Sequence, residues 1–257
     1  MNKPVIFSDL DDTLFQTKRK MKHELDALPF RCAALDRDMQ PRSFMDQEQA
    51  MFVDWLLENA ELIPVTARGS EELKRVQIAF SSWAIATHGA VIITPEGLPD
   101  AAWQQHMMTR LAPYADRLTA MQHEITAQMA LQGINGWARI NQEYDGTPVY
   151  LVMKHRDSTR VSELYTFADW LQQRFPLEGF YFHRNGNNVA WIPEPVDKGL
   201  AVGWLLNKLQ AERGTFPVLG FGDSLSDHRF LQLCHWFAVP QQSQYARAIN
   251  QHVFAGS

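Results

Sequence analysis

The chain has 257 residues and a formal net charge of −5; 46% of its residues are hydrophobic and 21% are charged. This composition is ordinary for a water-soluble globular protein and is ample for one or two domains. A nucleic-acid-binding domain would carry a basic balance with clustered Lys and Arg, so no nucleic-acid partner is expected.

The segments that could direct the chain to a membrane or a secretory route are not expected here. The apolar run Val5–Phe7 is interrupted at once by Asp9, unlike a signal peptide. No segment approaches the ~20 apolar residues of a membrane-spanning helix, so no membrane partner is expected. Cys32 and Cys234 lie far apart without C-x-x-C spacing, which favours free thiols and a cytoplasmic location. The oligomeric state is left open.

The two ends of the chain alternate between strand and helix. The predicted elements are a strand at 5–7, a helix at 46–59, a strand at 61–65, a helix opening at Ser70, a helix at 198–209, a strand at 217–221 and a helix from about 226. Residues 14–44, with a basic run from Lys18 to Lys22, are mixed in pattern and are predicted to be a long excursion that leaves the first strand. Strand–helix alternation predicts a parallel sheet with helical crossovers.

The middle of the chain shows a different pattern of predicted elements. It contains strand signals at 84–87 and 90–93, a helical stretch at 100–133, a helix at 161–175, and hairpins at 137–154 and 180–192. The sequence therefore predicts an α/β protein. Its Rossmann-like parallel-sheet core takes residues 1–87 and 193–257, and residues 88–192 form an inserted α+β cap domain.

Three predicted core strands end in polar clusters, which are Asp9/Asp11/Thr13, Thr66/Arg68 and Asp223/Ser224/Asp227. The carboxyl ends of parallel strands meet at one edge of a sheet, where α/β proteins bind their ligands. Strand alternation points Asp9 and Asp11 to the same side. Clustered carboxylates with a hydroxyl and a nearby lysine suit Mg²⁺ and a phosphate group.

Four motifs carry a family resemblance in order along nearly the whole chain. They are Asp9-Leu10-Asp11-Asp12-Thr13, Thr66 in Val65–Arg68, Lys198 in Asp197-Lys198-Gly199, and Gly222–Asp227. Together they resemble the haloacid dehalogenase superfamily of phosphotransferases. The insertion of about 100 residues before Lys198 is similar to the large α/β cap of its Cof-type and sucrose-phosphatase-like branch, which also holds phosphomannomutases.

The resemblance implies a role for each motif residue. Asp9 would attack phosphorus and form an aspartyl-phosphate, and Asp11 would protonate the leaving oxygen and then activate water. Thr66 would donate a hydrogen bond to a phosphoryl oxygen, and Lys198 would neutralise developing charge. Mg²⁺ would be the cofactor, held by the Asp9 carboxylate, the Asp11 main-chain carbonyl, Asp223 and, directly or through water, Asp227.

The same residues have ordinary structural interpretations. Thr66 suits a cap-like turn, Lys198 a solvated helix start, and Asp227 an early-helix acid. Arg68 is interpreted as a structural partner of a carboxylate and is left out of the catalytic set. Asp12 stands where the superfamily often has glycine and receives no role.

Recognition of the leaving group is expected in the cap. The candidate substrate-binding residues are Thr66, Lys198, His88, Arg139, Lys154 and Arg184, although the last lies in a hairpin tip that is also ordinary turn chemistry. His88 stands where relatives carry asparagine, and a histidine bonded within a turn is an equal alternative.

The sequence predicts a Mg²⁺-dependent phosphomonoester hydrolase acting on a small phosphorylated metabolite, with a sugar phosphate as the expected substrate. A phosphomutase of the phosphomannomutase kind is the alternative enzyme. A non-catalytic module that binds phosphorylated ligands is a third possibility, but such a binder needs no acid/base aspartate at Asp11.

Overall fold

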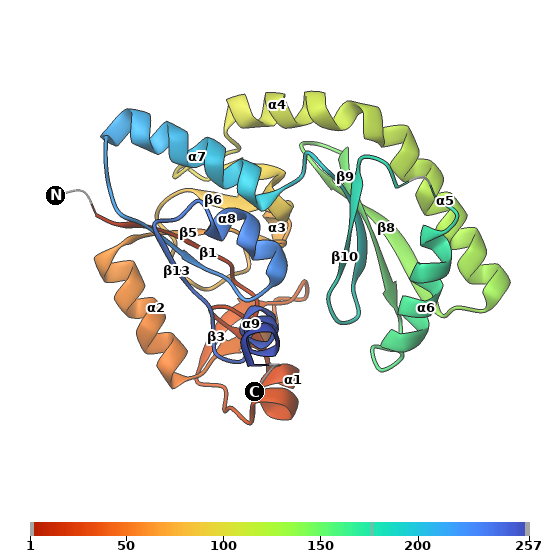
Figure 1. The fold of residues 1–257 in the computed structure, drawn as a ribbon, viewed down its shortest axis with the longest axis horizontal. Coiled ribbons are helices and arrows are strands. Elements are labelled where there is room, and N and C mark those ends of the chain that lie inside the picture. The colour runs from red at the N-terminus through yellow and green to blue at the C-terminus, as the bar shows by residue number, and fades with distance from the viewer. Residues whose placement is uncertain (1–2, 176, 255–257) are drawn as a thin grey trace. The chain divides into compact units, whose positions relative to one another are not determined.

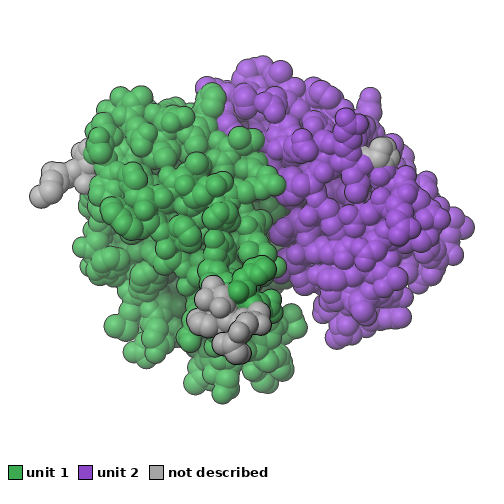
Figure 2. Space-filling model, in the orientation of Figure 1, with its two compact units in different colours: residues 1–100, 197–257 green, residues 101–196 purple. Residues whose placement is uncertain are grey.

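The computed structural model of the chain describes residues 3–175 and 177–254 (Figure 1). The chain divides into two compact units, unit 1 with residues 1–100 and 197–257 and unit 2 with residues 101–196 (Figure 2). These boundaries lie 13 and 4 residues beyond those expected from the sequence. Strand pairing explains the first shift, because β6 (Ala84–Ala86) pairs with β7 (Val91–Ile93) inside unit 1. Hydrogen bonds from Val196 N–H to Pro193 and from Tyr181 to the Val196 carbonyl explain the second.

A four-stranded parallel sheet forms the centre of unit 1, in the order β13-β12-β1-β5. The strands are β1 (Val5–Ser8), β5 (Glu61–Pro64), β12 (Val218–Phe221) and β13 (Trp236–Ala238). All of β1 is buried between its neighbours, and Ser8 is in register with Pro64 and with Phe221. The predicted parallel core is thereby confirmed, with the ends of β1, β5 and β12 side by side.

Helices lie on both sides of this sheet, with α2 (Gln47–Asn59) and α7 (Lys198–Arg213) on opposite sides (Figure 1). A capping box starts α2: the Asp46 carboxylate accepts from Gln49 N–H at 2.8 Å, and Gln49 accepts from Asp46 N–H at 3.1 Å. Shorter elements complete the helical part of the unit, namely α3 (Ser70–Leu73), the 3₁₀ turn η4 (Leu225–Asp227), α8 (His228–Leu231) and α9 (Gln244–Phe254).

Residues 16–45 fold into a small antiparallel sheet, where the sequence predicted a long excursion and no strands were assigned. The order is β2-β4-β3, with β2 at Gln16–Thr17, β4 at Pro41–Met45 and β3 at Arg31–Leu35. The helical turns α1 (Lys18–Lys20) and η1 (Met21–Leu25) follow β2. Register shifts in β3 between Cys32 and Leu35 break the period-two alternation that would have announced the strand.

Unit 2 is an antiparallel sheet covered on one face by helices. The sheet order is β10-β11-β9-β8, and the strands are β8 (Gly136–Glu143), β9 (Thr147–His155), β10 (Phe180–Arg184) and β11 (Val189–Pro193). Apolar residues of α5 (Ala115–Gln132) and α6 (Val161–Gln172) pack with Leu151, Met153 and Trp191 to form its core.

The helical stretch predicted over 100–133 is divided. It consists of α4 (Ala101–Leu111), the 3₁₀ turn η3 (Ala112–Tyr114) and α5. Pro113 lies in the turn, where a residue without an N–H cannot continue a helical hydrogen-bond ladder. None of the described helices combines the length and apolar character needed to cross a bilayer.

Candidate active site

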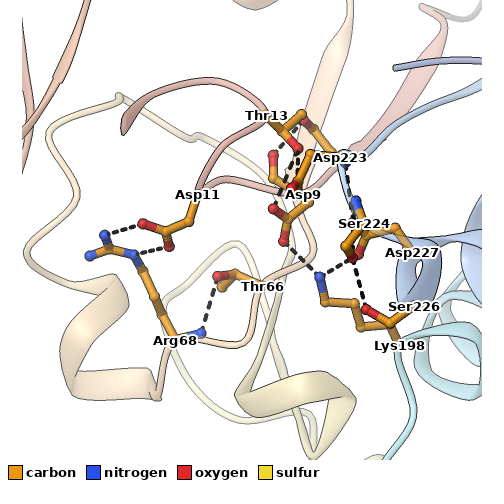
Figure 3. Close-up of polar contacts among 11 residues, drawn as sticks. Asp9, Asp11, Thr13, Thr66, Arg68, Lys198, Asp223, Ser224, Ser226 and Asp227 are labelled. Carbon is orange, nitrogen blue, oxygen red and sulfur yellow. Dashed lines mark hydrogen bonds and ion pairs between the residues drawn. The ribbon is translucent and has the colours of Figure 1, made fainter. Parts of the chain in front are cut away.

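The centre of the site is a buried ion-pair cluster at the end of β1 (Figure 3). Asp9 follows β1 directly, and its Oδ1 lies 2.6 Å from Lys198 Nζ. The same ammonium group lies 2.7 Å from Asp227 Oδ1. Buried charges are energetically costly unless they are paired. The fold therefore has to hold these three side chains in one specific arrangement.

Lys198 is fixed by the start of α7. The Asp197 carboxylate caps the helix by accepting from Leu200 N–H at 3.0 Å, and it also pairs with Arg229. Gly199 packs so closely that a Cβ there would lie 2.6 Å from the Arg229 carbonyl oxygen. Burial alone would lower the pKa of Lys198, but Asp227 and Asp9 reverse this and leave that pKa above its ordinary value. The lysine is therefore a permanent cation.

Asp227 is held by the loop after β12. Its Oδ2 accepts from the N–H groups of Asp223 and Ser224, at 3.2 and 3.0 Å, and from the Ser224 hydroxyl at 2.7 Å. Burial raises the pKa of Asp227, but the Lys198 charge and these hydrogen bonds outweigh burial and leave its pKa lowered. Because protein donors engage both carboxylate oxygens, Asp227 is better suited to hold Lys198 and the loop than to bind a cation directly.

The carboxylates of Asp9, Asp223 and Asp227 offer oxygens that all lie within 4.8 Å of one another. Burial, aided by repulsion from the neighbouring acids, raises the pKa of Asp9 and raises that of Asp223 to about 7. Three carboxylates around one lysine leave an excess of negative charge, and oxygen donors of this type fit a hard divalent cation such as Mg²⁺. Asp223 and Asp9 are the residues best placed to hold it.

Asp11 does not join this cluster. Its carboxylate points toward Arg68 (Figure 3), which donates to it through Nε and one terminal nitrogen, both at 2.7 Å. Arg68 N–H also donates to the Thr66 hydroxyl oxygen at 3.1 Å. A hydroxyl that accepts one bond can still donate its own hydrogen, so Thr66 keeps the capacity expected of it. The sequence indicated a carboxylate partner for Arg68 without identifying Asp11.

Asp12 has a conformational explanation. Its φ is 66°, in the left-handed region that glycine adopts freely and aspartate tolerates better than most residues. Glycine at this position in the superfamily and aspartate here therefore meet the same backbone requirement. The Asp12 carboxylate lies 2.8 Å from Lys20 Nζ, so one member of the basic run ties the 16–45 sheet to the β1 loop.

His88 lies in a strained turn, η2 (Thr87–Gly89), between the second and third motifs. Thr87, His88 and Gly89 all have positive φ, which is unusual for a β-branched residue such as Thr87. Thr87 N–H donates to the Arg68 carbonyl and His88 N–H to the Thr66 carbonyl. A Cβ at Gly89 would lie 2.4 Å from the Asp197 carbonyl oxygen. The turn therefore packs against the backbone of both motifs, and His88 itself is buried.

The structure separates the cap candidates. Ala138, Ile140 and Met153 pack toward the helices of unit 2, so the alternate positions Arg139 and Lys154 lie on the other face of the sheet. Arg139 stacks over Trp137 at 5.3 Å. Arg184 instead shares the helix-covered face with Phe182, and it pairs with Asp169 of α6. The period-two relation of Arg184 to Phe180 and Phe182 is a sequence signal that could have placed it there.

No protein-family model matches this sequence, and no curated protein matches it significantly. Solved structures do match the fold. The C-terminal domain of trehalose-6-phosphate phosphatase from C. albicans has a TM-score of 0.56 and 13% identity, covering 99% of this chain and 78% of that chain. A protein from Thermoplasma acidophilum has a TM-score of 0.55 and 13% identity, covering 97% and 90%.

A Streptococcus mutans protein has a TM-score of 0.52 and 11% identity, covering 97% of this chain and 91% of that chain. These matches extend over both units, so the parallel core and the α+β insertion occur together in each of them. The chain therefore shares its fold with these proteins, one of which is a trehalose-6-phosphate phosphatase domain.

Proposed function

We propose that the chain is a Mg²⁺-dependent phosphomonoester hydrolase that acts on a small phosphorylated metabolite through an aspartyl-phosphate on Asp9. The observation that carries the proposal is the buried Asp9–Lys198–Asp227 cluster beside Asp223, at the carboxyl edge of a parallel sheet. Burying these charges is costly, and a phosphoryl-transfer site is a use for which this charge pattern is suited.

Asp9 supplies the nucleophile. A carboxylate oxygen forms a bond to phosphorus while the bond from phosphorus to the leaving oxygen breaks, and that oxygen departs with the electron pair. Lys198, held 2.6 Å from Asp9, offsets the charge that gathers on the carboxylate and the phosphoryl oxygens. Water then attacks phosphorus, the bond to Asp9 breaks, and inorganic phosphate leaves.

Asp11 serves the proton transfers. It donates a proton to the leaving oxygen in the first step and accepts one from the attacking water in the second. The Thr66 hydroxyl donates to a phosphoryl oxygen. Mg²⁺ bound by Asp9 and Asp223, with the Asp11 carbonyl, would supply positive charge that lessens repulsion between nucleophile and phosphate.

A sugar phosphate is the substrate class that we favour. One structure with the same fold is that of a trehalose-6-phosphate phosphatase domain. The face of the unit 2 sheet opposite α5 and α6 carries an exposed arginine over an aromatic ring, with Lys154 two strand positions away from it in register. Cations, amides and aromatic rings suit a hydroxyl-rich or anionic leaving group, so we assign substrate selection to unit 2.

The test is phosphate release from a panel of phosphomonoesters, with and without a chelator. We expect Mg²⁺-dependent turnover that falls by about 10⁴-fold or more in Asp9→Asn, the scale typical of losing a nucleophile. Asp54→Asn is the matched control, because Asp54 forms an exposed pair with Arg31. Absence of turnover of every ester would refute the proposal, and isomerised sugar phosphate appearing faster than phosphate would favour a mutase.

A further inference from the structure

Asp9 and Asp11 of the first motif pair with different cationic side chains. Asp9 is buried and pairs with Lys198, whereas the Asp11 side chain is 46% exposed and pairs with Arg68. Neither pair shares a residue with the other. An exposed aspartate side chain without a partner would sample several rotamers, because its χ torsions are free to rotate in solvent.

The Asp11–Arg68 ion pair has a two-pronged geometry. The guanidinium group approaches both carboxylate oxygens at 2.7 Å, the forked arrangement that only arginine can make. Such a pair fixes the orientation of the carboxylate plane as well as its position. A lysine in the same place would offer a point charge and no orientation.

Contacts of both its side chain and its main chain hold Arg68 in place. The side chain is only 15% exposed, and the guanidinium lies 5.2 Å from the ring centre of the fully buried Phe15. The main-chain N–H of Arg68 donates to the Thr66 hydroxyl, and its main-chain carbonyl accepts from Thr87 N–H of the strained turn. The arginine is therefore the buried, fixed member of the pair, and Asp11 is the more exposed member that it holds.

The β1 loop is folded so that this contact can form. Asp12 N–H donates to the Phe15 carbonyl at 2.8 Å, and Asp11 and Phe15 form a backbone bridge. The ring that supports the guanidinium is thus placed beside the carboxylate that the guanidinium binds. The left-handed conformation of Asp12 is the turn that makes this return possible.

We propose that Arg68 is a positioning residue that sets where the Asp11 carboxyl group stands, and thereby serves proton transfer to the leaving group and not attack by Asp9. This inference rests on the proposed function. It differs from a direct role of Arg68 in binding phosphate, which would affect every phosphomonoester alike.

The test compares two esters. An alkyl phosphate needs a proton on its leaving oxygen, whereas p-nitrophenyl phosphate releases a stabilised anion. In Arg68→Gln we compare kcat/KM, which reports only the steps up to formation of the aspartyl-phosphate. We expect kcat/KM for the alkyl phosphate to fall by about 10²-fold, at the lower end of what general acid catalysis contributes, and kcat/KM for p-nitrophenyl phosphate to fall by less than about 5-fold. Arg68→Lys should lie between Arg68→Gln and the unmodified chain, and it replaces Arg68→Gln if that variant does not fold.

Arg31→Gln is the control, because Arg31 makes the same two-pronged contact with Asp54 at 2.6 and 2.8 Å on the exposed surface. It should leave both esters unaffected. In an Asp11→Asn background, adding Arg68→Gln should lower kcat/KM for the alkyl phosphate by less than about a further 3-fold. The reason is that the effects of residues that act as a unit are not additive.

The outcomes separate the two proposals. Failure of the unmodified chain to hydrolyse either ester overturns the proposed function and this inference with it. Turnover by the unmodified chain with an equal loss of kcat/KM on both esters in Arg68→Gln overturns this inference alone. So does a full additional loss when Arg68→Gln is combined with Asp11→Asn.

Discussion

The candidate site residues of the two units handle charge in opposite ways. Unit 1 buries Asp9, Lys198 and Asp227 against one another, and unit 2 keeps Arg139 exposed and Arg184 in a surface pair with Asp169. Buried charges make a fold depend on every partner, whereas surface charges cost almost nothing to change. The difference indicates that the buried cluster of unit 1 tolerates few substitutions, whereas these positions of unit 2 are freer to vary.

The largest expected effect comes from removing the buried lysine, which tests the contrast between buried and exposed charges. Lys198→Ala leaves Asp9 and Asp227 buried without their cation, so we expect a loss of about 3–5 kcal/mol in the free energy of unfolding. Lys74→Ala, which removes the lysine of the exposed pair with Glu71, should cost less than about 1 kcal/mol. Urea unfolding of both variants measures the difference, and equal costs would contradict the contrast.

The acids of unit 1 should make the chelated protein sensitive to pH. Burial raises the pKa of Asp9 and, to about 7, that of Asp223, so the folded state binds protons more tightly than the unfolded state, whose aspartates titrate near 3.9. The contribution of Asp223 to stability should therefore fall by about 1–4 kcal/mol as pH rises from about 4 to about 7, and Asp9 acts in the same direction.

Other shifts in the cluster act outside this window. The raised pKa of Lys198 matters only at alkaline pH, and the lowered pKa of Asp227 only in strong acid. Thermal melting with a chelator at several pH values is the measurement. Asp223→Asn should flatten the profile, and a melting temperature that rises between pH 5 and 7 would refute the expectation.

Backbone packing in unit 1 gives the next effect. In Gly89→Ala the new Cβ meets the Asp197 carbonyl oxygen, so we expect a loss of about 1–3 kcal/mol beyond the conformational cost of a positive φ. Gly97→Ala is the control, because Gly97 has a φ of 80° with open space around it. Urea midpoints of the two variants should differ clearly, and indistinguishable midpoints would rule out tight packing of the turn.

The smallest effects on stability belong to unit 2. Arg139→Ala and Lys154→Ala should leave the free energy of unfolding within about 0.5 kcal/mol. If they read the leaving group, KM for a sugar phosphate should rise by about 3–10-fold, equivalent to roughly 1 kcal/mol. Arg184→Ala should raise KM less, since Asp169 holds its side chain on the helix-covered face.

Arg174→Ala is the matched control in unit 2, because Arg174 stacks on Trp170 at 3.8 Å without a carboxylate partner among the described ion pairs. It should leave both KM and stability unchanged. An unchanged KM in Arg139→Ala and Lys154→Ala would contradict a role for Arg139 and Lys154 in substrate selection.

Much of unit 1 could be predicted because its signals are local. Buried strands ending in polar clusters placed Asp9, Thr66 and Asp223 at one edge of the sheet, and the parallel order confirms that placement. The apolar periodicity of residues 46–59 predicted α2. The β2-β4-β3 sheet was missed because bulges in β3 disturb the alternation on which strand prediction depends.

Pairings between side chains were the harder part of the site. Asp11 pairs with Arg68 and not with the buried cluster. This pairing depends on the Phe15 ring and on the turn at Asp12, and no sequence pattern predicts either of them. The side of the sheet occupied by Arg184 was readable from alternation, but its partner Asp169 lies on a different element. Contacts of this kind are set by three-dimensional packing and not by sequence spacing.

The central position of β1 has a consequence for how the protein is made. Ser8 pairs with Phe221, so the first strand cannot acquire its second neighbour until more than 200 further residues have been synthesised. At ~5–20 residues per second this delay is roughly 10–40 s, during which one edge of β1 stays open on the ribosome. Unit 2 is continuous in sequence and emerges within that interval. We therefore expect the nascent chain to be most prone to mispairing before β12 appears, and slower synthesis of residues 101–196 to prolong that vulnerable period.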